Sequence, residues 1–121
     1  MNTAFNPQRQ NYAKYDDNHY LLFLEEKEAE QKDEQGDTVN GYTYTGTEID
    51  GSTLIEAKDV TAENMRGKFI SGLIRKRYSQ DEVEAIILNG TQSMGHAAEM
   101  DALQAYRDDC KRKVDELLGR L

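Results

Sequence analysis

Residues Val39 to Thr47 read VNGYTYTGT and give the clearest indication of secondary structure in the chain. Within this stretch Tyr42 and Tyr44 alternate with Thr43 and Thr45, so the tyrosines share one face and the threonines share the other. Tyrosine and threonine both favour sheets, and alternation is the period of a strand. We therefore predict a β-strand here.

Two further short strands are predicted on either side of this one. Tyr20 to Leu24 is a continuous apolar run of strand length, and we place the start of its strand near His19. After the turn signal Asp50-Gly51, residues Thr53 to Ala57 can return as a third strand. The three strands predict an antiparallel meander, whose apolar face must be covered by other elements.

The acidic segment Glu25 to Asp37 admits two interpretations, a long hairpin or a loop. The hairpin would extend strands on both sides of Gly36. Four glycines recur every five residues in this region, and they lack the lysine and the strand-loop-helix context of a phosphate-binding loop. We interpret them as turn residues: Gly36, Gly41, Gly46 and Gly51.

The apolar period becomes helical after residue 60. Residues Thr61 to Tyr78 place their apolar side chains at intervals of three and four, as in an amphipathic helix. Ser79 and Glu82 then match a capping box, which starts a second helix. We expect Asn89-Gly90 to end that helix, with Gly90 in the left-handed conformation.

A long last helix is predicted from about His96 to Leu118. Its apolar residues form one continuous stripe, which requires a partner surface. The helix that begins at Thr61, the sheet and a symmetry-related copy are the alternatives. The stripe consists of Met100, Leu103, Tyr106, Cys110, Val114, Leu117 and Leu121.

The predicted fold class is α+β, with an N-terminal three-stranded antiparallel meander followed by two or three helices, the last one long. A chain of 121 residues is long enough for one domain. We expect a flexible N-terminal arm over residues 1–12 and a single domain over residues 13–121. Residues 13–57 would form its sheet and residues 58–121 its helices.

The charge of −8 belongs to the first half of the chain. Residues 1–57 contain twelve acidic and four basic side chains, whereas residues 58–121 contain eleven of each. Because phosphate neutralisation requires clustered cations, nucleic acid is an unlikely partner for the first half. No apolar run has the length of a signal-peptide core or a membrane span, so neither signal-peptide secretion nor membrane association is expected.

Few residues have the pattern of a catalytic, cofactor or metal site, and we predict no site of any of these kinds. His19 and His96 are far apart in the sequence and lie in no ligand motif. Cys110 falls on the apolar stripe, which predicts a core position and not a reactive thiol. Asp33 to Asp37 lacks the alternating ligands of a calcium loop. The chain is therefore not expected to be an enzyme.

Two groups of residues are candidates for contact with a partner. A basic cluster from Arg66 to Arg77 would suit an acidic surface, although the solvated face of an amphipathic helix is the more common explanation of such a cluster. Tyrosines near the N-terminus would suit an interface, although core packing is their more common fate. The candidates are Tyr12, Tyr15, Arg66, Arg75, Lys76, Arg77 and Tyr78.

Three stretches together resemble small uncharacterised proteins of gut-bacterial prophages that are encoded among tail genes. They are Tyr15 to Tyr20 (YDDNHY), Leu73 to Glu82 (LIRKRYSQDE) and Tyr106 to Lys111 (YRDDCK). The resemblance implies a tail accessory or tail fibre assembly protein, located in the bacterial cytoplasm or the virion. It supplies no active site.

The function expected from these observations is that of a non-catalytic protein-interaction module. Its partner would be a phage tail component or another copy of itself, as a homo-oligomer. The alternative is a small nucleic-acid-associated or regulatory protein that uses the basic helix 66–77, whose binding would weaken steeply with salt. An enzyme whose site forms only on oligomerisation would need carboxylates or His96 in a cleft.

Overall fold

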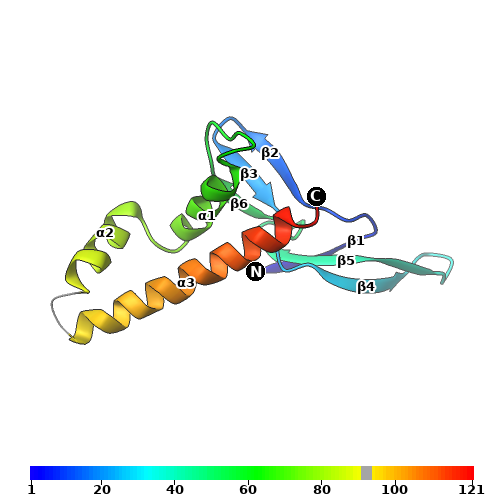
Figure 1. Ribbon diagram of the computed structural model, residues 1–121. Coiled ribbons are helices and arrows are strands. Elements are labelled where there is room, and N and C mark those ends of the chain that lie inside the picture. Colours follow the sequence, from blue (N-terminus) through cyan, green and yellow to red (C-terminus); the bar gives the residue numbers. More distant parts are fainter. Residues whose placement is uncertain (91–93) are drawn as a thin grey trace.

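The computed structural model describes residues 1–90 and 94–121, with the side chains of residues 1–90 and 97–121. It confirms the predicted α+β class and the long last helix (Figure 1). The described elements are β1 (Asn2–Asn6), β2 (Tyr12–Asp16), β3 (His19–Leu22), β4 (Lys27–Lys32), β5 (Thr38–Gly46), β6 (Thr53–Glu56), α1 (Met65–Arg75), α2 (Gln80–Asn89) and α3 (Met94–Leu118). None of these helices is long and apolar enough to cross a bilayer.

The strands form two antiparallel three-stranded sheets instead of the single meander that was predicted. One sheet has the order β1-β5-β4 and the other has the order β2-β3-β6. The predicted strands β3, β5 and β6 all exist, but β5 pairs with β1 and β4, whereas β3 pairs with β2 and β6. A backbone hydrogen bond of 3.2 Å from Thr45 N to Leu24 O joins the two groups of strands.

The N-terminal segment is ordered, which corrects the prediction of a flexible arm over residues 1–12. Strand β1 runs antiparallel to β5, with Asn2 opposite Gly46 and Asn6 opposite Tyr42. The hydroxyls of Thr3 and Thr45 lie 2.9 Å apart across this pair. Backbone pairing therefore orders a segment whose polar composition gave no sign of it.

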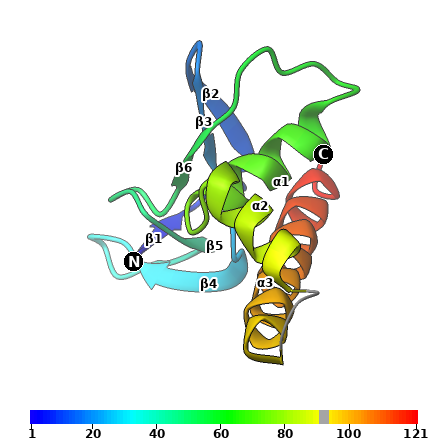
Figure 2. The ribbon, with the colours of Figure 1, turned by 90° about the vertical axis from the view of Figure 1, so that its left-hand side faces the viewer.

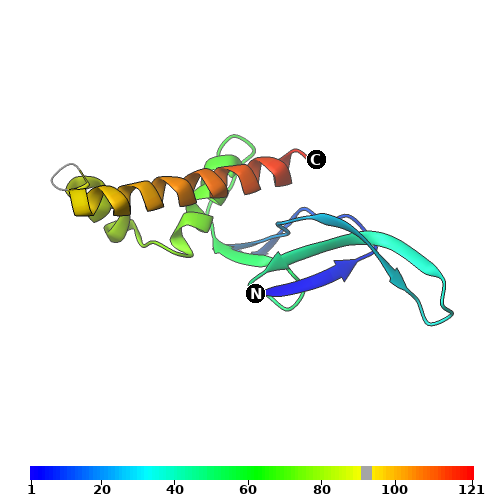
Figure 3. The same cartoon turned by 90° about the horizontal axis from the view of Figure 1, so that it is seen from below.

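The acidic segment is a hairpin, the first of the two interpretations. Strand β4 pairs with β5 from Lys27 opposite Thr43 to Lys32 opposite Thr38. In the turn, one carboxylate oxygen of Asp33 accepts the backbone N–H of Asp37 at 2.8 Å. The hairpin projects away from the helices (Figure 3). Its side chains are mostly exposed, which explains why no apolar pattern marks β4.

Two of the four glycines predicted in turns lie inside strand β5. Gly36 and Gly51 do occupy turns, with positive φ of 81° and 84°. Gly41 and Gly46 are instead strand residues. At Gly46 an added Cβ would lie 2.3 Å from the backbone oxygen of Ser52, where β5 passes close to the start of β6. Glycine is required there by the close approach of two backbone segments.

The substitution Gly46→Ala is expected to lower the free energy of unfolding by about 1–3 kcal/mol, because backbone atoms must move to admit the methyl group. Gly67→Ala is the matched control: Gly67 lies in α1, and an added Cβ there has no atom within 4 Å. Alanine should stabilise that helical site by about 0.5–1 kcal/mol. Urea unfolding followed by circular dichroism measures both. Equal stability of the wild type and Gly46→Ala would contradict the close approach.

Local side-chain chemistry sets the boundaries of α1 and α2. Helix α1 begins at Met65 and not at Thr61, because Asn64 folds back and its side chain accepts the N–H of Thr61 at 2.7 Å. The predicted capping box is confirmed: Ser79 Oγ accepts the N–H of Glu82 at 3.1 Å. Helix α2 ends at Asn89 with Gly90 as its C-cap, as predicted, but the predicted left-handed conformation of Gly90 was wrong, since its φ is −61°.

The apolar stripe of α3 is buried inside the same chain. Leu103, Cys110, Val114 and Leu117 are buried, whereas Leu121 is exposed. Helix α3 packs against α1 (Figure 2). The C-terminal part of its stripe, from Cys110 to Leu117, joins a core cluster with residues of strands β3 and β6. The core contains Leu22, Leu24, Ile55, Ala57, Phe69, Ile70, Leu73, Cys110, Val114 and Leu117. Of the three partner surfaces considered, α1 and a sheet therefore cover the stripe.

Candidate protein-binding site

Four of the seven arginines hold carboxylates of the same chain. Arg9 lies 2.8 Å from Glu26, and Arg66 lies 2.7 Å from Asp115. Arg112 pairs with Asp109 at 2.9 Å. Arg120 pairs with Glu116 and donates to it from two nitrogens. An acidic protein thus neutralises most of its arginines internally.

The Arg120 pair belongs to a buried network that ties the end of α3 to both sheets. The guanidinium donates to the backbone oxygens of Gln10 and Phe23, at 3.1 and 2.6 Å, and lies 3.4 Å from Glu26. Tyr44 donates its hydroxyl to Glu26 at 2.8 Å, and burial raises the pKa of Tyr44 to about 12. These groups satisfy one another, so we assign the network a structural role.

The pKa of Glu26 is lowered by its neighbours in this network. Burial alone would raise the pKa of this carboxyl, but hydrogen bonds from Arg9 and Tyr44 and the charge of Arg120 outweigh that effect. Glu26 therefore stays ionised in the folded protein to a lower pH than an ordinary glutamate does.

The other three arginines, Arg75, Arg77 and Arg107, form no ion pair in the described part of the chain. Arg77 lies over two aromatic rings, 5.4 Å from the centroid of Tyr78 and 5.2 Å from that of Tyr106. Tyr106 is fixed in turn, because its hydroxyl donates to the backbone oxygen of Leu73 at 2.9 Å. The cation is thus held beside α1 by stacking and not by a carboxylate.

A groove lies between α1, α2 and α3, and we name it the α1–α2 groove. Its volume is about 280 Å³. Its apolar walls come from α1 and α2, and arginines lie at positions 75 and 107. That volume is below the roughly 300–1,000 Å³ of small-molecule sites, so it suits one or two side chains better than a cofactor. The lining residues are Ser71, Ile74, Arg75, Tyr78, Gln80, Val83, Ile87 and Arg107.

Helix α2 supplies the apolar wall because its own apolar face is only partly covered. The helix packs on α3, yet none of its residues is buried. Val83 and Ile86 are half-buried, and Ile87 is 42% exposed. Amphipathic helices normally bury their apolar face against a partner surface. Of this face, Val83 and Ile87 line the groove.

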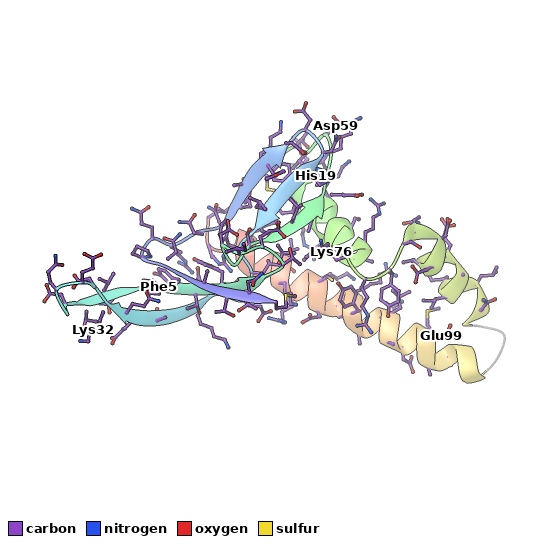
Figure 4. All side chains as sticks on the ribbon, turned by 180° about the vertical axis from the view of Figure 1, so that it is seen from behind. Phe5, His19, Lys32, Asp59, Lys76 and Glu99 are labelled. Atoms are coloured by element: carbon purple, nitrogen blue, oxygen red, sulfur yellow. The ribbon has the colours of Figure 1, made fainter. Side chains whose placement is uncertain are left out.

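The seven residues proposed for partner contact fall into separate places. Arg75 and Tyr78 line the α1–α2 groove, and Arg77 stacks beside it. Lys76 is exposed at the end of α1 (Figure 4). Arg66 is held by Asp115 at the other end of that helix.

The two N-terminal tyrosines lie outside the groove. The ring of Tyr12 packs 5.4 Å from that of Phe69, against the core. Tyr15 is exposed, with its ring 6.5 Å from His19. Sequence reasoning missed Arg107, Val83 and Ile87, although the apolar run Ile86-Ile87-Leu88 after the capping box was a visible signal.

The remaining candidate groups offer little chemistry. A second hollow, of about 780 Å³, is lined mainly by polar and charged residues of both signs, including His19, Glu56 and Lys68, and it lacks the apolar walls of a typical ligand site. Among the described residues no three metal-ligating side chains cluster. Cys110 is buried, and burial raises its pKa, as expected for a core thiol. The side chain of His96 lies outside the described residues.

Comparisons with protein-family models, with curated proteins and with solved structures find no match to this chain.

Proposed function

We propose that the chain is a non-catalytic protein-interaction module that binds an acidic segment of a partner protein in the α1–α2 groove. The observation that carries this proposal is the distribution of arginine partners. In a protein of charge −8, four arginines hold carboxylates, and the three that hold none among the described residues lie in or beside one groove with apolar walls.

The composition of the groove supports binding to protein. Arginine and tyrosine are enriched at protein interfaces, where an apolar centre is surrounded by a polar rim. Here Ile74, Val83 and Ile87 supply the apolar part, and Arg75 and Arg107 supply the charge. A segment that combines carboxylates with an aliphatic side chain would meet both requirements.

The biological setting that we propose rests on the sequence resemblance alone. It favours an accessory or assembly protein of a bacteriophage or prophage tail, present in the bacterial cytoplasm or the virion. The partner would then be a tail component or another copy of the chain. The groove is compatible with either, because both can present an acidic, aliphatic segment.

The unpaired arginines also favour the alternative of a nucleic-acid-associated protein. Two features weigh against it. The chain has an excess of acidic over basic residues, 23 against 15, and would repel a polyanion at long range. The groove is also lined by aliphatic side chains, whereas phosphate binding depends on clustered cations.

Selection of peptides from a random display library tests the proposal, because such a library samples every combination of acidic and aliphatic residues. The wild type is expected to enrich peptides that contain Asp or Glu together with Ile, Leu or Val. The double variant Arg75→Glu/Arg107→Glu should lower the affinity for the selected peptides by at least ~10-fold, since each peptide carboxylate then meets a like charge. Fluorescence anisotropy with a labelled selected peptide measures the affinity.

The matched control is Lys27→Glu/Lys32→Glu, which makes the same change in net charge on β4. Figure 4 shows Lys32 at the far tip of the hairpin, at the opposite end of the molecule from Glu99. This control should bind the peptide within ~2-fold of the wild type, because charges more than a Debye length away are screened. An equal loss of peptide affinity in the groove variant and in this control contradicts binding in the groove. If a labelled single-stranded oligonucleotide binds tightly and in a salt-sensitive way while the peptides do not, the result favours the nucleic-acid alternative.

A further inference from the structure

The turn between β5 and β6 presents one apolar side chain to solvent between two acidic ones. Ile49 is 91% exposed, and its neighbours in the sequence are Glu48 and Asp50. In the described residues neither carboxylate is within ion-pair distance of a cation. The turn therefore carries an exposed aliphatic group and two carboxylates without a cationic partner among the described residues.

The turn is fixed by its own hydrogen bonds. The N–H of Glu48 donates to Ser52 O at 2.8 Å, and the N–H of Gly51 donates to Glu48 O at 3.0 Å. Asp50 accepts from the backbone N–H of Ser52 at 2.9 Å and also from its hydroxyl. Ser52 itself is buried. Ile49 is thus held outward by a rigid turn, so docking it elsewhere would cost little conformational entropy.

The chemistry of this turn matches that of the α1–α2 groove. The turn offers an aliphatic side chain between two carboxylates, and the groove offers aliphatic walls between two arginines. The turn is absent from the lining of the groove in the same molecule. Figure 1 also places β5 and β6 in the sheet half and α2 at the far end of the helical half.

We propose that the α1–α2 groove of one copy binds the β5–β6 turn of a second copy, with Ile49 against Ile74, Val83 and Ile87. Glu48 and Asp50 then face Arg75 and Arg107. This inference rests on the proposed function and assigns its partner as a second copy of this chain. Because the groove and the turn are different surfaces, the contact is heterologous and leaves a free groove and a free turn at the two ends, so that copies form a chain or a ring.

The contact is small, and its affinity is correspondingly low. One side chain with two charge pairs buries less than the roughly 1,200 Å² of a stable interface, and we expect a weak dissociation constant of roughly 10–500 µM. The charge of −8 on each copy also opposes association, and salt screens this repulsion together with the local attraction. Salt dependence is therefore a poor test, and complementation between one-sided variants is a better one.

Two variants, each lacking one surface, test the proposal by sedimentation velocity at ~1 mM protein, above the expected dissociation constant. Glu48→Gln/Ile49→Ser keeps the groove and removes the turn; Arg75→Gln/Arg107→Gln/Ile87→Ser keeps the turn and removes the groove. The wild type should form species larger than a dimer. Each variant alone should sediment as a 13.8 kDa monomer. Their equimolar mixture should form a dimer and nothing larger, because only one compatible pair of surfaces remains.

A wild type that stays monomeric, or a mixture that stays monomeric, overturns the inference. So does association that persists in either variant alone. Circular dichroism of each variant establishes that it is folded. Anisotropy with the display-selected peptide separates the two proposals: if that peptide binds the wild-type groove while no self-association occurs, the second copy is excluded and the proposed function stands. If the wild type neither binds the peptide nor self-associates, the proposed function and the second-copy inference both fail.

Discussion

Replacing Arg120 with methionine is expected to lower the free energy of unfolding by about 3–5 kcal/mol, the usual cost of removing one partner of a buried ion pair. The Arg120 side chain is 2% exposed and that of Glu26 is 8% exposed. The guanidinium also satisfies the backbone oxygens of Gln10 and Phe23. Methionine replaces part of the apolar stem but leaves a carboxylate and two carbonyls without this donor. Urea denaturation measures the loss.

Two companion variants identify the cause of that loss. Arg9→Met removes another cation from the same Glu26, but the Arg9 side chain is half exposed, so water replaces it and the loss should be much smaller. Adding Glu26→Gln to Arg120→Met should restore part of the stability, because the buried carboxylate that has lost one of its two cations is then replaced by a neutral amide. If Arg120→Met costs no more than Arg9→Met, the buried network is not what holds the end of α3.

Acid unfolding provides an independent measurement of the same network. The pKa of Glu26 in the folded protein is below its usual value of 4.5. Its contribution to stability is therefore complete above pH 4.5 and is lost as the pH falls through the lowered value. Arg120→Met removes one of the groups that lower this pKa, so its acid-induced loss of stability should begin at a higher pH than in the wild type.

The substitution Phe69→Ala is expected to cost about 3–5 kcal/mol, the usual range for a fully buried phenylalanine. Phe69 is completely buried, and its ring lies 5.4 Å from that of Tyr12 and 5.3 Å from that of Tyr20. Alanine leaves a cavity between α1 and the β2-β3-β6 sheet and removes both aromatic contacts. Thermal unfolding followed by calorimetry measures the change.

Tyr15→Ala, in strand β2, is the control for the loss of an aromatic ring. Tyr15 is 63% exposed, and its substitution should change stability by less than about 0.5 kcal/mol. Phe69→Leu should fall between the two, because leucine fills most of the cavity. A loss in Phe69→Ala as small as that in Tyr15→Ala would mean that the β2-β3-β6 sheet and α1 do not share the core described above.

The elements that the sequence predicted are those whose signal is local. The run from Tyr20 to Leu24 is apolar throughout, and Ser79 and Glu82 satisfy one another within a single turn, so a short window contains all the information. Strand pairing is different, because it depends on segments far apart. Strand β1 is mostly polar and β4 carries charged side chains of both signs, so neither showed that it pairs with β5 in a sheet separate from that of β3. The single meander was the simplest arrangement of the three visible strands.

The candidate site was predictable only where its residues are neighbours in the sequence. Arg75, Arg77 and Tyr78 follow one another at the end of α1 and appeared as a basic cluster. Arg107 comes about thirty positions later, and only the packing of α3 against α1 brings it to the same groove. Arg66 looked equivalent to Arg75 in the sequence, yet Asp115 of α3 neutralises it. Whether a charge is available depends on tertiary partners that spacing along one helix does not reveal.

Because of the order of the elements along the chain, the strands are synthesised before the helices that cover them. The six strands in the described part of the chain lie within residues 2–56, whereas the helices that cover Leu22 and Ile55 begin at Met65. At a synthesis rate of about 5–20 residues per second, about 3–13 seconds pass between the completion of β6 and the arrival of Arg120. During this interval the nascent protein has an uncovered apolar sheet face. Its twelve acidic residues are then already in place, and we expect their repulsion to keep neighbouring nascent chains apart on the ribosome until the helices arrive.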